Sequence, residues 1–328
     1  MQGLLTGKLP PELLRELLAQ AAAGAPEVRL GPAVGEDACA IEVGGGVLVA
    51  ATDPITLTGA GIGAHAVVIN ANDVAVMGVR PRWFLAVVLL PEGSAADEVR
   101  ALLAGMRRAL DAVGAVLVGG HTEVTSAVVQ PVVVGQMLGF AADGRFVSTG
   151  GAAPGQRIVQ VGPAPVEAAA VLAAEAPGAA VGAEVRAQAL AALEDPGISV
   201  VEAALAAAEL GATALHDPTE GGLSAGIHEL AEASGVALRV DAEAVLWFEP
   251  GRALCRAAGA DPWGALASGA LLAAFEPERV AGALDALAAR GFAARAVAWA
   301  EEGDGVSCGG APLPRFDRDE VARVLAAD

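Results

Sequence analysis

The sequence predicts two domains that each combine helices and strands, of α/β or α+β class. Short strand-like apolar runs alternate with helical patterns along most of the 328 residues. A chain of this length can bury two separate cores. The stretch STGGAAPGQ, residues 148–156, concentrates small and turn-forming residues without periodicity. We therefore expect a first domain of residues 1–150 and a second of residues 151–328.

The elements of the first half follow from local patterns. Near the start, Pro10 and Pro11 stand in first-turn positions of a predicted helix. The run Gly45–Asp53 is short, β-branched and bounded by glycines, which is typical of a buried strand. A helix over residues 64–78 follows the glycine-rich turn Gly59–Gly63. The remaining predictions are strands at 82–90, 115–120 and 127–140 and an amphipathic helix at 95–114.

The second half restarts the same alternation after the proposed boundary. Apolar runs bounded by turn residues predict strands, and longer alanine-rich patterns predict helices. The predicted strands are 157–162, 212–216, 236–240, 269–275 and 293–299, and the predicted helices are 165–176, 200–210, 220–233, 252–258 and 278–290.

The composition disfavours several classes of partner and location. A formal net charge of -19 disfavours nucleic acid, because that binding depends on lysine and arginine. Apolar runs such as Phe84–Leu90 are far shorter than the roughly 18 residues of a membrane-spanning helix, and the first residues do not resemble a signal peptide. The three cysteines lie far apart with no CxxC pair, so we expect a cytoplasmic protein without disulfides, zinc or a membrane partner.

Acidic residues recur beside glycine, alanine or proline, either after apolar strands or inside an apolar helix. One such acid is commonly a cap or turn residue, whereas a set spread over most of the chain indicates a shared function. Ligands of open α/β sheets bind at the carboxyl ends of strands, where such acids can meet. Oxygen-only clusters suit magnesium, which shares its shell with substrate phosphates. The acids are Asp37, Asp53, Asp73, Glu123 and Asp217.

The stretch INANDVAVMGVRP, residues 69–81, places polar side chains in one of the most apolar parts of the chain. One interpretation makes Asp73 a metal ligand presented by a helix, with Asn70 one turn earlier on the same face. The other makes this group a buried polar knot that neighbouring backbone satisfies. The sequence leaves both open.

The stretch HDPTEGG has the features of a phosphate site. Asp217 and Pro218 form a turn, and Gly221 and Gly222 open a helix, so we expect bare backbone N–H groups and the positive end of the helix dipole to face a ligand. Glycine would allow close approach of phosphate oxygens. A plain helix start with two destabilising glycines is the alternative.

The single lysine and the histidines have two possible roles each. Lys8 could reach a phosphate as a point charge or remain solvated at the chain start. His65 and His228 lie in predicted helices and are expected to be structural. His121 and His216 lie inside acidic motifs, where they could orient ligands or contact substrate.

The ordered set GEDACA, ATDP, NANDVAVMG, GGHTE and HDPTEGG resembles the successive motifs of the aminoimidazole ribonucleotide (AIR) synthase-like superfamily. This superfamily includes AIR synthase, the hydrogenase maturation protein HypE, selenophosphate synthetase and thiamine-monophosphate kinase. The resemblance spans roughly Gly35–Gly222 and keeps motif order and spacing. It implies a two-domain PurM/HypE-like fold, with an N-terminal α/β domain that dimerises through its sheet and a C-terminal α+β domain. It also implies ATP and Mg²⁺ held between the domains.

The resemblance also implies roles for individual residues. Members use ATP to phosphorylate an amide or carbonyl oxygen or another small acceptor, which needs mainly positioning and neutralisation of phosphate charge. His121 stands where relatives often carry an acid, so the metal role there either passes to Glu123 or is lost. The implied catalytic residues are Asp53, Asp73 and His121; those at the nucleotide are Lys8, Asn70, Gly119, Gly120, Thr219, Gly221 and Gly222; those at the metal are Asp37, Asp53, Asp73, Glu123 and Asp217.

Among these subfamilies the chain is most similar to HypE, whose tail ends in a cysteine that accepts a carbamoyl group. Here Leu313-Pro314-Arg315 leads to Phe316 and an acidic helix instead. Our first hypothesis is an ATP- and magnesium-dependent enzyme with an unidentified small-molecule or peptide acceptor. The alternatives are a non-catalytic nucleotide-binding partner protein and a thiamine-monophosphate kinase-like enzyme. The segment PITLTGAG after Asp53 does not match that kinase's substrate-binding segment.

Overall fold

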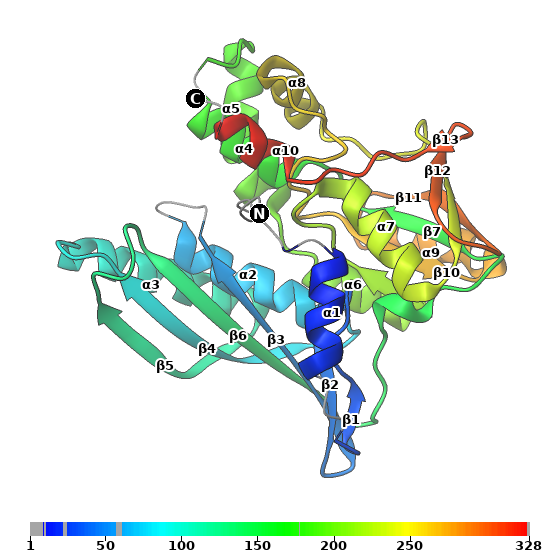
Figure 1. Ribbon diagram of the computed structural model, residues 1–328, viewed down its shortest axis with the longest axis horizontal. Coiled ribbons are helices and arrows are strands. Elements are labelled where there is room, and N and C mark those ends of the chain that lie inside the picture. Colours follow the sequence, from blue (N-terminus) through cyan, green and yellow to red (C-terminus); the bar gives the residue numbers. More distant parts are fainter. Residues whose placement is uncertain (1–8, 10, 22–24, 57–60, 177, 327–328) are drawn as a thin grey trace. The chain divides into compact units, whose positions relative to one another are not determined.

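The computed structural model describes residues 9, 11–21, 25–56, 61–176 and 178–326 (Figure 1). They form two compact units. The N-terminal unit comprises Gly24–Gly31 and Asp37–Phe146, and the C-terminal unit comprises Met1–Ala23, Pro32–Glu36 and Val147–Asp328. Both units combine helices with a sheet, which confirms the predicted fold class. Lys8, Pro10 and part of the predicted Gly59–Gly63 turn lie outside the described residues.

A mixed sheet forms the base of the N-terminal unit. Its strands are β1 (Val28–Leu30), β2 (Cys39–Val43), β3 (Gly46–Ile55), β4 (Pro81–Leu90), β5 (Val116–Val124) and β6 (Val132–Ala141), and its helices are α2 (Ile62–Ala75) and α3 (Ala96–Val113). The strand order is β1-β2-β3-β6-β4-β5, with β4 and β5 parallel and the other neighbours antiparallel. The predicted elements are confirmed, whereas the short strands β1 and β2 were not predicted.

Helix α2 is buried almost all round, because it packs on β3 and β6 and is covered by α3. Its sequence is correspondingly apolar on every face, as expected of a helix enclosed by protein. In contrast, α3 is amphipathic and buries Leu102, Met106 and Leu110 on one side only. The polar residues of α2 therefore lie in the interior of this unit.

The C-terminal unit has a second, larger sheet. Its strands are β7 (Arg157–Val161), β8 (Ala214–His216), β9 (Ala237–Val240), β10 (Leu271–Phe275), β11 (Ala294–Glu301), β12 (Val306–Cys308) and β13 (Ala311–Pro312). Their order is β13-β12-β9-β11-β7-β10-β8. The helices are α1 (Pro11–Ala21), α4 (Val166–Glu175), α5 (Ala183–Ala191), α6 (Val201–Glu209), α7 (Gly222–Ser234), α8 (Glu249–Ala258), α9 (Pro277–Ala289) and α10 (Glu320–Leu325), and the short turns η1 (Thr149–Gly151) and η2 (Leu193–Gly197) complete the unit.

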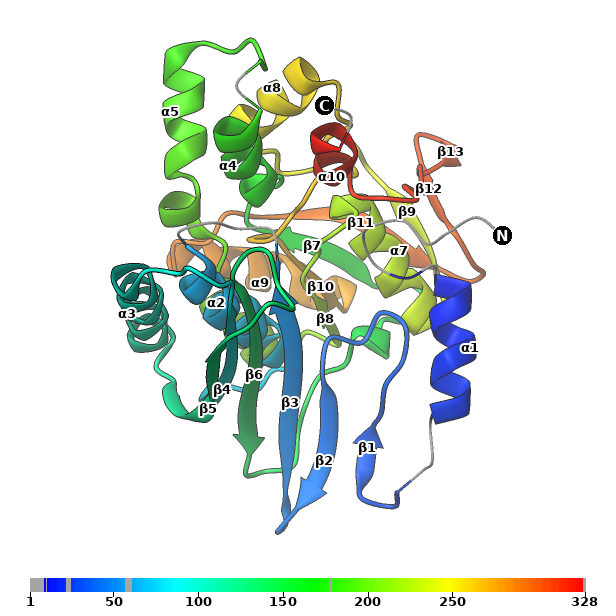
Figure 2. The same cartoon turned by 60° about the vertical axis from the view of Figure 1, so that its left-hand side comes forward.

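Two clusters of buried side chains stabilise the C-terminal unit. In the first, Leu223, Ile227 and Leu230 of α7 pack against side chains of the sheet. In the second, α4, α5, α8 and α10 pack on one another, a grouping that Figure 2 shows. The predicted helices and strands of this half are confirmed, whereas α5, β12 and β13 were not predicted. The assignment of α1 to this unit is also new, since it depends on contacts distant in sequence.

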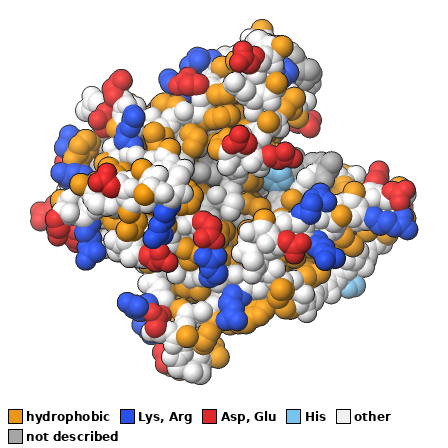
Figure 3. All heavy atoms as spheres, turned by 180° about the vertical axis from the view of Figure 1, so that it is seen from behind, with side chains coloured by type: hydrophobic (Ala, Val, Ile, Leu, Met, Phe, Trp, Pro, Cys, Tyr) orange, Lys and Arg blue, Asp and Glu red, His pale blue; other side chains and the backbone are white. Residues whose placement is uncertain are grey.

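Acidic and basic side chains lie interspersed on the face of the molecule that Figure 3 shows. Several are paired, as in Arg100 with Asp97 and Arg290 with Glu209. In the described part of the chain, no helix combines the length and apolar character needed to cross a membrane.

Candidate functional site

Asp53 lies near the carboxyl end of β3, and its backbone is held by Asn70 of α2. The Asp53 N–H donates to Asn70 Oδ1 at 2.9 Å, and Asn70 Nδ2 lies 3.3 Å from the Asp53 carbonyl oxygen. Asn70 Nδ2 also donates to the Ala66 carbonyl at 2.9 Å. Asn70 is 0% exposed, whereas Asp53 is exposed. The two predicted site residues therefore form one unit, in which Asn70 fixes the strand that presents the Asp53 carboxylate.

Small residues in neighbouring strands make room for this arrangement. Asp53 pairs with Gly135 of β6, Gly135 with Ala86 of β4, and Ala86 with Gly120 of β5. A Cβ on Gly135 would lie 2.4 Å from Asn70 Nδ2, and one on Gly120 would lie 2.0 Å from the Ala86 carbonyl oxygen. Neither distance is tolerable, so glycine is required at both positions. Close packing thus explains Gly120, for which the family resemblance implies a place at the nucleotide.

We expect Asn70→Ala to lower the affinity for magnesium and ATP by about 10–100-fold, as loss of a ligand's supporting hydrogen bonds commonly does. The Asp53 N–H would lose its acceptor, at a cost of about 1–3 kcal/mol in stability. Magnesium titrations of ATP binding measure the first effect. Gln130→Ala is the control, because Gln130 also donates an amide N–H to a backbone carbonyl beside β3, that of Thr56. Reduced stability with unchanged magnesium dependence would make Asn70 a core residue only.

Asp73 and Asp37 belong to the same unit as Asp53. Asp73 lies one turn after Asn70 on α2 and is 5% exposed, so its carboxylate lies in the interior. Asp37 is half-buried and precedes β2. Backbone groups satisfy Asn70, as the buried polar knot predicts, whereas the metal-ligand interpretation of Asp73 stays a prediction.

The GGHTE motif lies on β5, which is exposed along its whole length. His121 Nε2 lies 3.3 Å from Glu123 Oε2, because alternate residues of a strand share a face. Two strands, β6 and β4, separate β5 from β3. At about 4.8 Å per strand, β3 and β5 lie roughly 14 Å apart across the sheet, and Glu123 is displaced further along β5 from Gly120, the residue level with Asp53. The expectation that these strand-end acids meet is therefore wrong within one chain, because the sequence does not reveal strand order.

Asp217 and Pro218 connect β8 to α7, as predicted for a turn at a strand end. Asp217 is 2% exposed and Thr219 is half-buried. The Thr219 carbonyl accepts hydrogen bonds from the N–H groups of Gly222 at 3.1 Å and Ala267 at 3.2 Å. The C-terminal unit therefore presents Asp217 and Thr219 from a turn fixed on two sides.

The prediction of bare N–H groups at the start of α7 is wrong. The Gly221 N–H donates to Asp319 Oδ2 at 2.9 Å, and the Ser224 N–H donates to the Trp263 carbonyl at 3.0 Å. Glycine is required here for backbone reasons. Gly222 has φ +71°, and a Cβ on it would lie 2.4 Å from the Trp263 carbonyl oxygen. The chain's own C-terminal segment and the loop around Trp263 thus cover this helix start.

Two further polar residues support this part of the C-terminal unit: His216, which the sequence analysis named as a possible ligand contact, and Glu36, which it missed. His216 is 3% exposed, and its Nε2 lies 3.0 Å from Glu229 Oε2 on α7. Glu36 accepts the Thr149 N–H at 3.3 Å through Oε2. Glu36 belongs to the GEDACA motif, so its place next to Asp37 was the available signal. His216 therefore links the end of β8 to α7, and Glu36 fixes the backbone of η1.

The residues present fit a magnesium–nucleotide complex by their donor chemistry. Mg²⁺ takes one or two carboxylates and completes its shell with water and phosphate oxygens. Asp53 and Asp73 offer such oxygens within the N-terminal unit. Among the described residues, no three His, Cys, Asp or Glu side chains gather closely enough to hold a metal by themselves. The site residues stay predictions, and Lys8 falls outside the described ranges.

Known proteins share this sequence pattern and this architecture. The N-terminal domain of AIR synthase related protein matches residues 35–141, and the C-terminal domain matches residues 153–309. Carbamoyl dehydratase HypE of Rhodobacter capsulatus is 31% identical over 240 residues, covering 72% of this chain and 68% of that protein. The hydrogenase maturation protein HypE in complex with ATP has TM-score 0.72 at 22% identity, covering 93% of this chain and 91% of that chain.

A further solved structure, AaThiL complexed with AMPPCP and TMP, has TM-score 0.73 at 19% identity and covers 93% of this chain and 94% of that chain. These structural likenesses show the fold, and the domain matches extend through both compact units. The chain therefore belongs to the AIR synthase related protein family.

Proposed function

We propose that this chain is an ATP- and magnesium-dependent enzyme that transfers a phosphoryl group to a carbonyl, amide or other small acceptor, in the manner of a HypE-like protein. The observation that carries the proposal is the pair formed by Asp53 and Asn70, in which a buried amide fixes an exposed carboxylate. A solved HypE in complex with ATP has the same fold. The acceptor is a small molecule or a peptide-borne group.

The chain's residues would act mainly by positioning and by charge neutralisation. Magnesium would offset the negative charge of the phosphates when bound. Asp53 and Asp73 would hold the metal from the N-terminal unit, with Asn70 keeping the Asp53 strand in place. Asp217, Thr219, Gly119, Gly120, His121 and Glu123 stay candidates that the family resemblance implies.

Calorimetry of ATP binding with and without magnesium tests the proposal on the intact chain. We expect magnesium-dependent binding, because the phosphates would otherwise meet carboxylates of the same charge. Release of phosphate on addition of candidate acceptors then separates the enzyme from a nucleotide-binding partner protein. Absence of ATP binding at millimolar nucleotide would refute the proposal.

A thiamine-monophosphate kinase-like activity is the second candidate, and the fold shared with AaThiL complexed with AMPPCP and TMP favours it. This candidate predicts that thiamine monophosphate becomes phosphorylated at the expense of ATP. Mass measurement of the product decides between it and transfer to an amide or carbonyl oxygen.

We also propose that the chain forms a homodimer through the sheet of the N-terminal unit. Strand β5 ends the strand order and exposes apolar side chains. Val116, Leu117 and Val118 are 56%, 51% and 53% exposed. An apolar edge strand of this kind is a template for pairing with another chain. A second copy presents the same surface, as a two-fold dimer requires.

Leu117→Arg is expected to convert the dimer to a monomer, since it places a charge in the apolar contact. Light scattering coupled to size-exclusion chromatography measures the mass directly. Leu103→Arg is the matched control, because Leu103 is 41% exposed on α3. A wild-type monomer at micromolar concentration, or a dimer that survives the Leu117 change, would contradict this interface.

We also propose a cytoplasmic location. The three cysteines are free thiols, which is compatible with a reducing compartment.

A further inference from the structure

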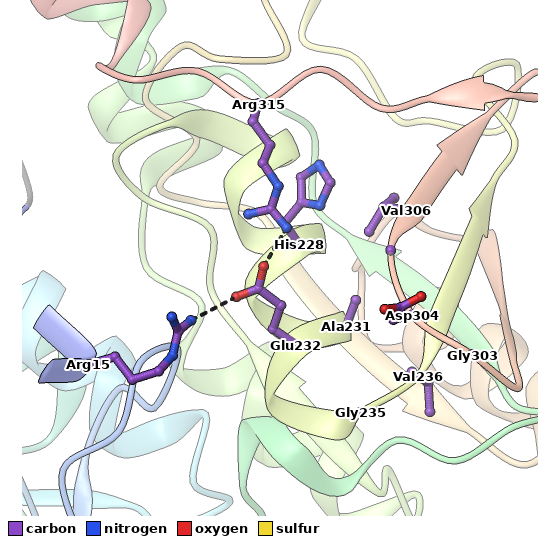
Figure 4. Close-up of a pocket in the computed structure, with 11 residues that line it drawn as sticks. Arg15, His228, Ala231, Glu232, Gly235, Val236, Gly303, Asp304, Val306 and Arg315 are labelled. Carbon is purple, nitrogen blue, oxygen red and sulfur yellow. Dashed lines mark hydrogen bonds and ion pairs between the residues drawn. The ribbon is translucent and has the colours of Figure 1, made fainter. Parts of the chain in front are cut away.

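A cavity of about 360 Å³ lies beside the second half of α7, entirely within the C-terminal unit (Figure 4). Its volume falls within the range of small-molecule pockets, roughly 300–1,000 Å³. On α7, His228, Ala231 and Glu232 share the face that lines it, because they are spaced three and four residues apart. The other walls come from α1, from the turn between β11 and β12, and from the segment that follows β13.

One side of the cavity has two guanidinium groups that share one carboxylate. Arg315 forms an ion pair with Glu232 Oε1, and an Arg15 nitrogen lies 3.7 Å from Glu232 Oε2 (Figure 4). The second distance is too long for a hydrogen bond, so this ion pair does not use up the N–H donors of Arg15. Since two cations face one anion, this side has an excess of one positive charge, which suits a ligand carboxylate.

His228 supplies a buried acceptor beside the two arginines. Its side chain lines the cavity and is 5% exposed, and its Nε2 lies 3.1 Å from the Leu313 carbonyl oxygen. A carbonyl only accepts, so Nε2 carries the proton. Burial and the nearby Arg315 charge lower the pKa of His228, so the ring is neutral at neutral pH. Nδ1 is then an acceptor without a hydrogen-bond partner among the described residues, and a ligand N–H would satisfy it.

The other side of the cavity is apolar and also has an acid. Its apolar residues are Ala231, Val236 and Val306. Asp304 lies on this side, away from the two arginines, and is exposed (Figure 4). Gly303 and Gly305 flank it with φ +116° and +85°, conformations that glycine adopts readily. The turn therefore presents a carboxylate at the edge of the apolar surface.

We propose that this cavity binds a basic α-amino acid. The α-carboxylate of the ligand pairs with Arg15 and Arg315, and its α-ammonium donates to Glu232 and His228. The side-chain methylenes cover the apolar surface, and the terminal cation reaches Asp304. A positively charged ligand also suits a protein whose formal net charge is -19.

Ligand-observed NMR titrations of the intact chain, at low salt and without nucleotide, test the class of ligand. The probes are L-lysine, L-norleucine, which lacks the terminal cation, and L-lysine methyl ester, which lacks the carboxylate charge. We expect L-lysine to bind about two- to fivefold more tightly than either analogue, as the loss of one exposed ion pair implies. Equal affinity for L-lysine and either analogue, or no binding of L-lysine at millimolar concentration, would overturn the proposal.

Substitutions at exposed positions assign the two sides of the cavity. Asp304→Asn is expected to lower the affinity for L-lysine to that for L-norleucine and to leave L-norleucine binding unchanged, because only the terminal cation reaches Asp304. Arg15→Gln is expected to weaken both ligands by a similar factor, since both carry the α-carboxylate. All substituted positions are exposed, so we expect the fold to remain.

Glu302→Gln is the matched control, because Glu302 is an exposed acid two residues from Asp304 and outside the lining of the cavity. Equal losses of L-lysine affinity in Glu302→Gln and Asp304→Asn would show general attraction to an acidic surface and would rule out the site. Since no nucleotide enters these measurements, their outcome is independent of the proposed function.

Discussion

Replacing Asp53 by asparagine is expected to lower ATP turnover by a factor on the order of 100 or more while the protein remains folded. Asparagine keeps the shape of the side chain but removes the charge that would hold magnesium. Asp53 is exposed, and its backbone bonds to Asn70 do not depend on its carboxylate. The change therefore separates chemistry from stability more cleanly than a change at buried Asp73.

Phosphate release and calorimetric ATP affinity, measured over a range of magnesium concentrations, give the result. Asp97→Asn is the control, since Asp97 is an exposed acid of the same unit that pairs with Arg100 on α3. Asp73→Asn is expected to lose magnesium-dependent binding as well. Unchanged turnover in the Asp53 variant would show that the acidic residues of this unit do not take part in the reaction and have a structural role instead. Unchanged ATP binding with no turnover in wild type would favour a nucleotide-binding partner protein.

Leu230→Ala is expected to reduce the free energy of unfolding of the C-terminal unit by about 2–5 kcal/mol. Leu230 is 0% exposed and packs with Leu223 and Ile227 of α7 against the sheet. Its removal leaves a cavity in the layer that positions the Asp217 turn. Denaturant unfolding followed by tryptophan fluorescence measures the change.

The matched control is Leu190→Ala on α5, because Leu190 is 52% exposed. That change is expected to alter stability by less than about 0.5 kcal/mol. Similar losses in both variants would mean that helix propensity or the unfolded state, rather than the packing of α7, determines the effect. A loss at Leu230 alone would show that the core under α7 maintains this part of the fold.

Local patterns sufficed to predict most elements of both units. The run Gly45–Asp53 corresponds to β3, and the helical pattern at 95–114 corresponds to α3. These patterns are readable because each element buries one face or is enclosed completely. The short strands β1 and β13 were missed, since three or two residues carry no period. The two-domain fold was predicted from the family resemblance, which depends on the order of the motifs.

The candidate site was only partly predictable. The sequence identified Asn70 and Asp53 separately, but their hydrogen bonds join residues far apart in the chain. It placed Asp53 and Glu123 at strand ends, yet two intervening strands separate them in the sheet. Strand order depends on which edges pair during folding, and local periodicity contains no information about that choice.

The sequence by itself determined most of the elements, the order of the acidic motifs and the family of this protein, because these depend on neighbouring residues and on motif spacing. Only the tertiary structure decided what surrounds each motif. Asp319 lies about a hundred positions after Gly221 along the chain, and burial brings them within hydrogen-bond distance. The helix start that the sequence predicts to be open is therefore closed by the chain's own carboxylate, because long-range packing satisfies a donor that local reasoning leaves free.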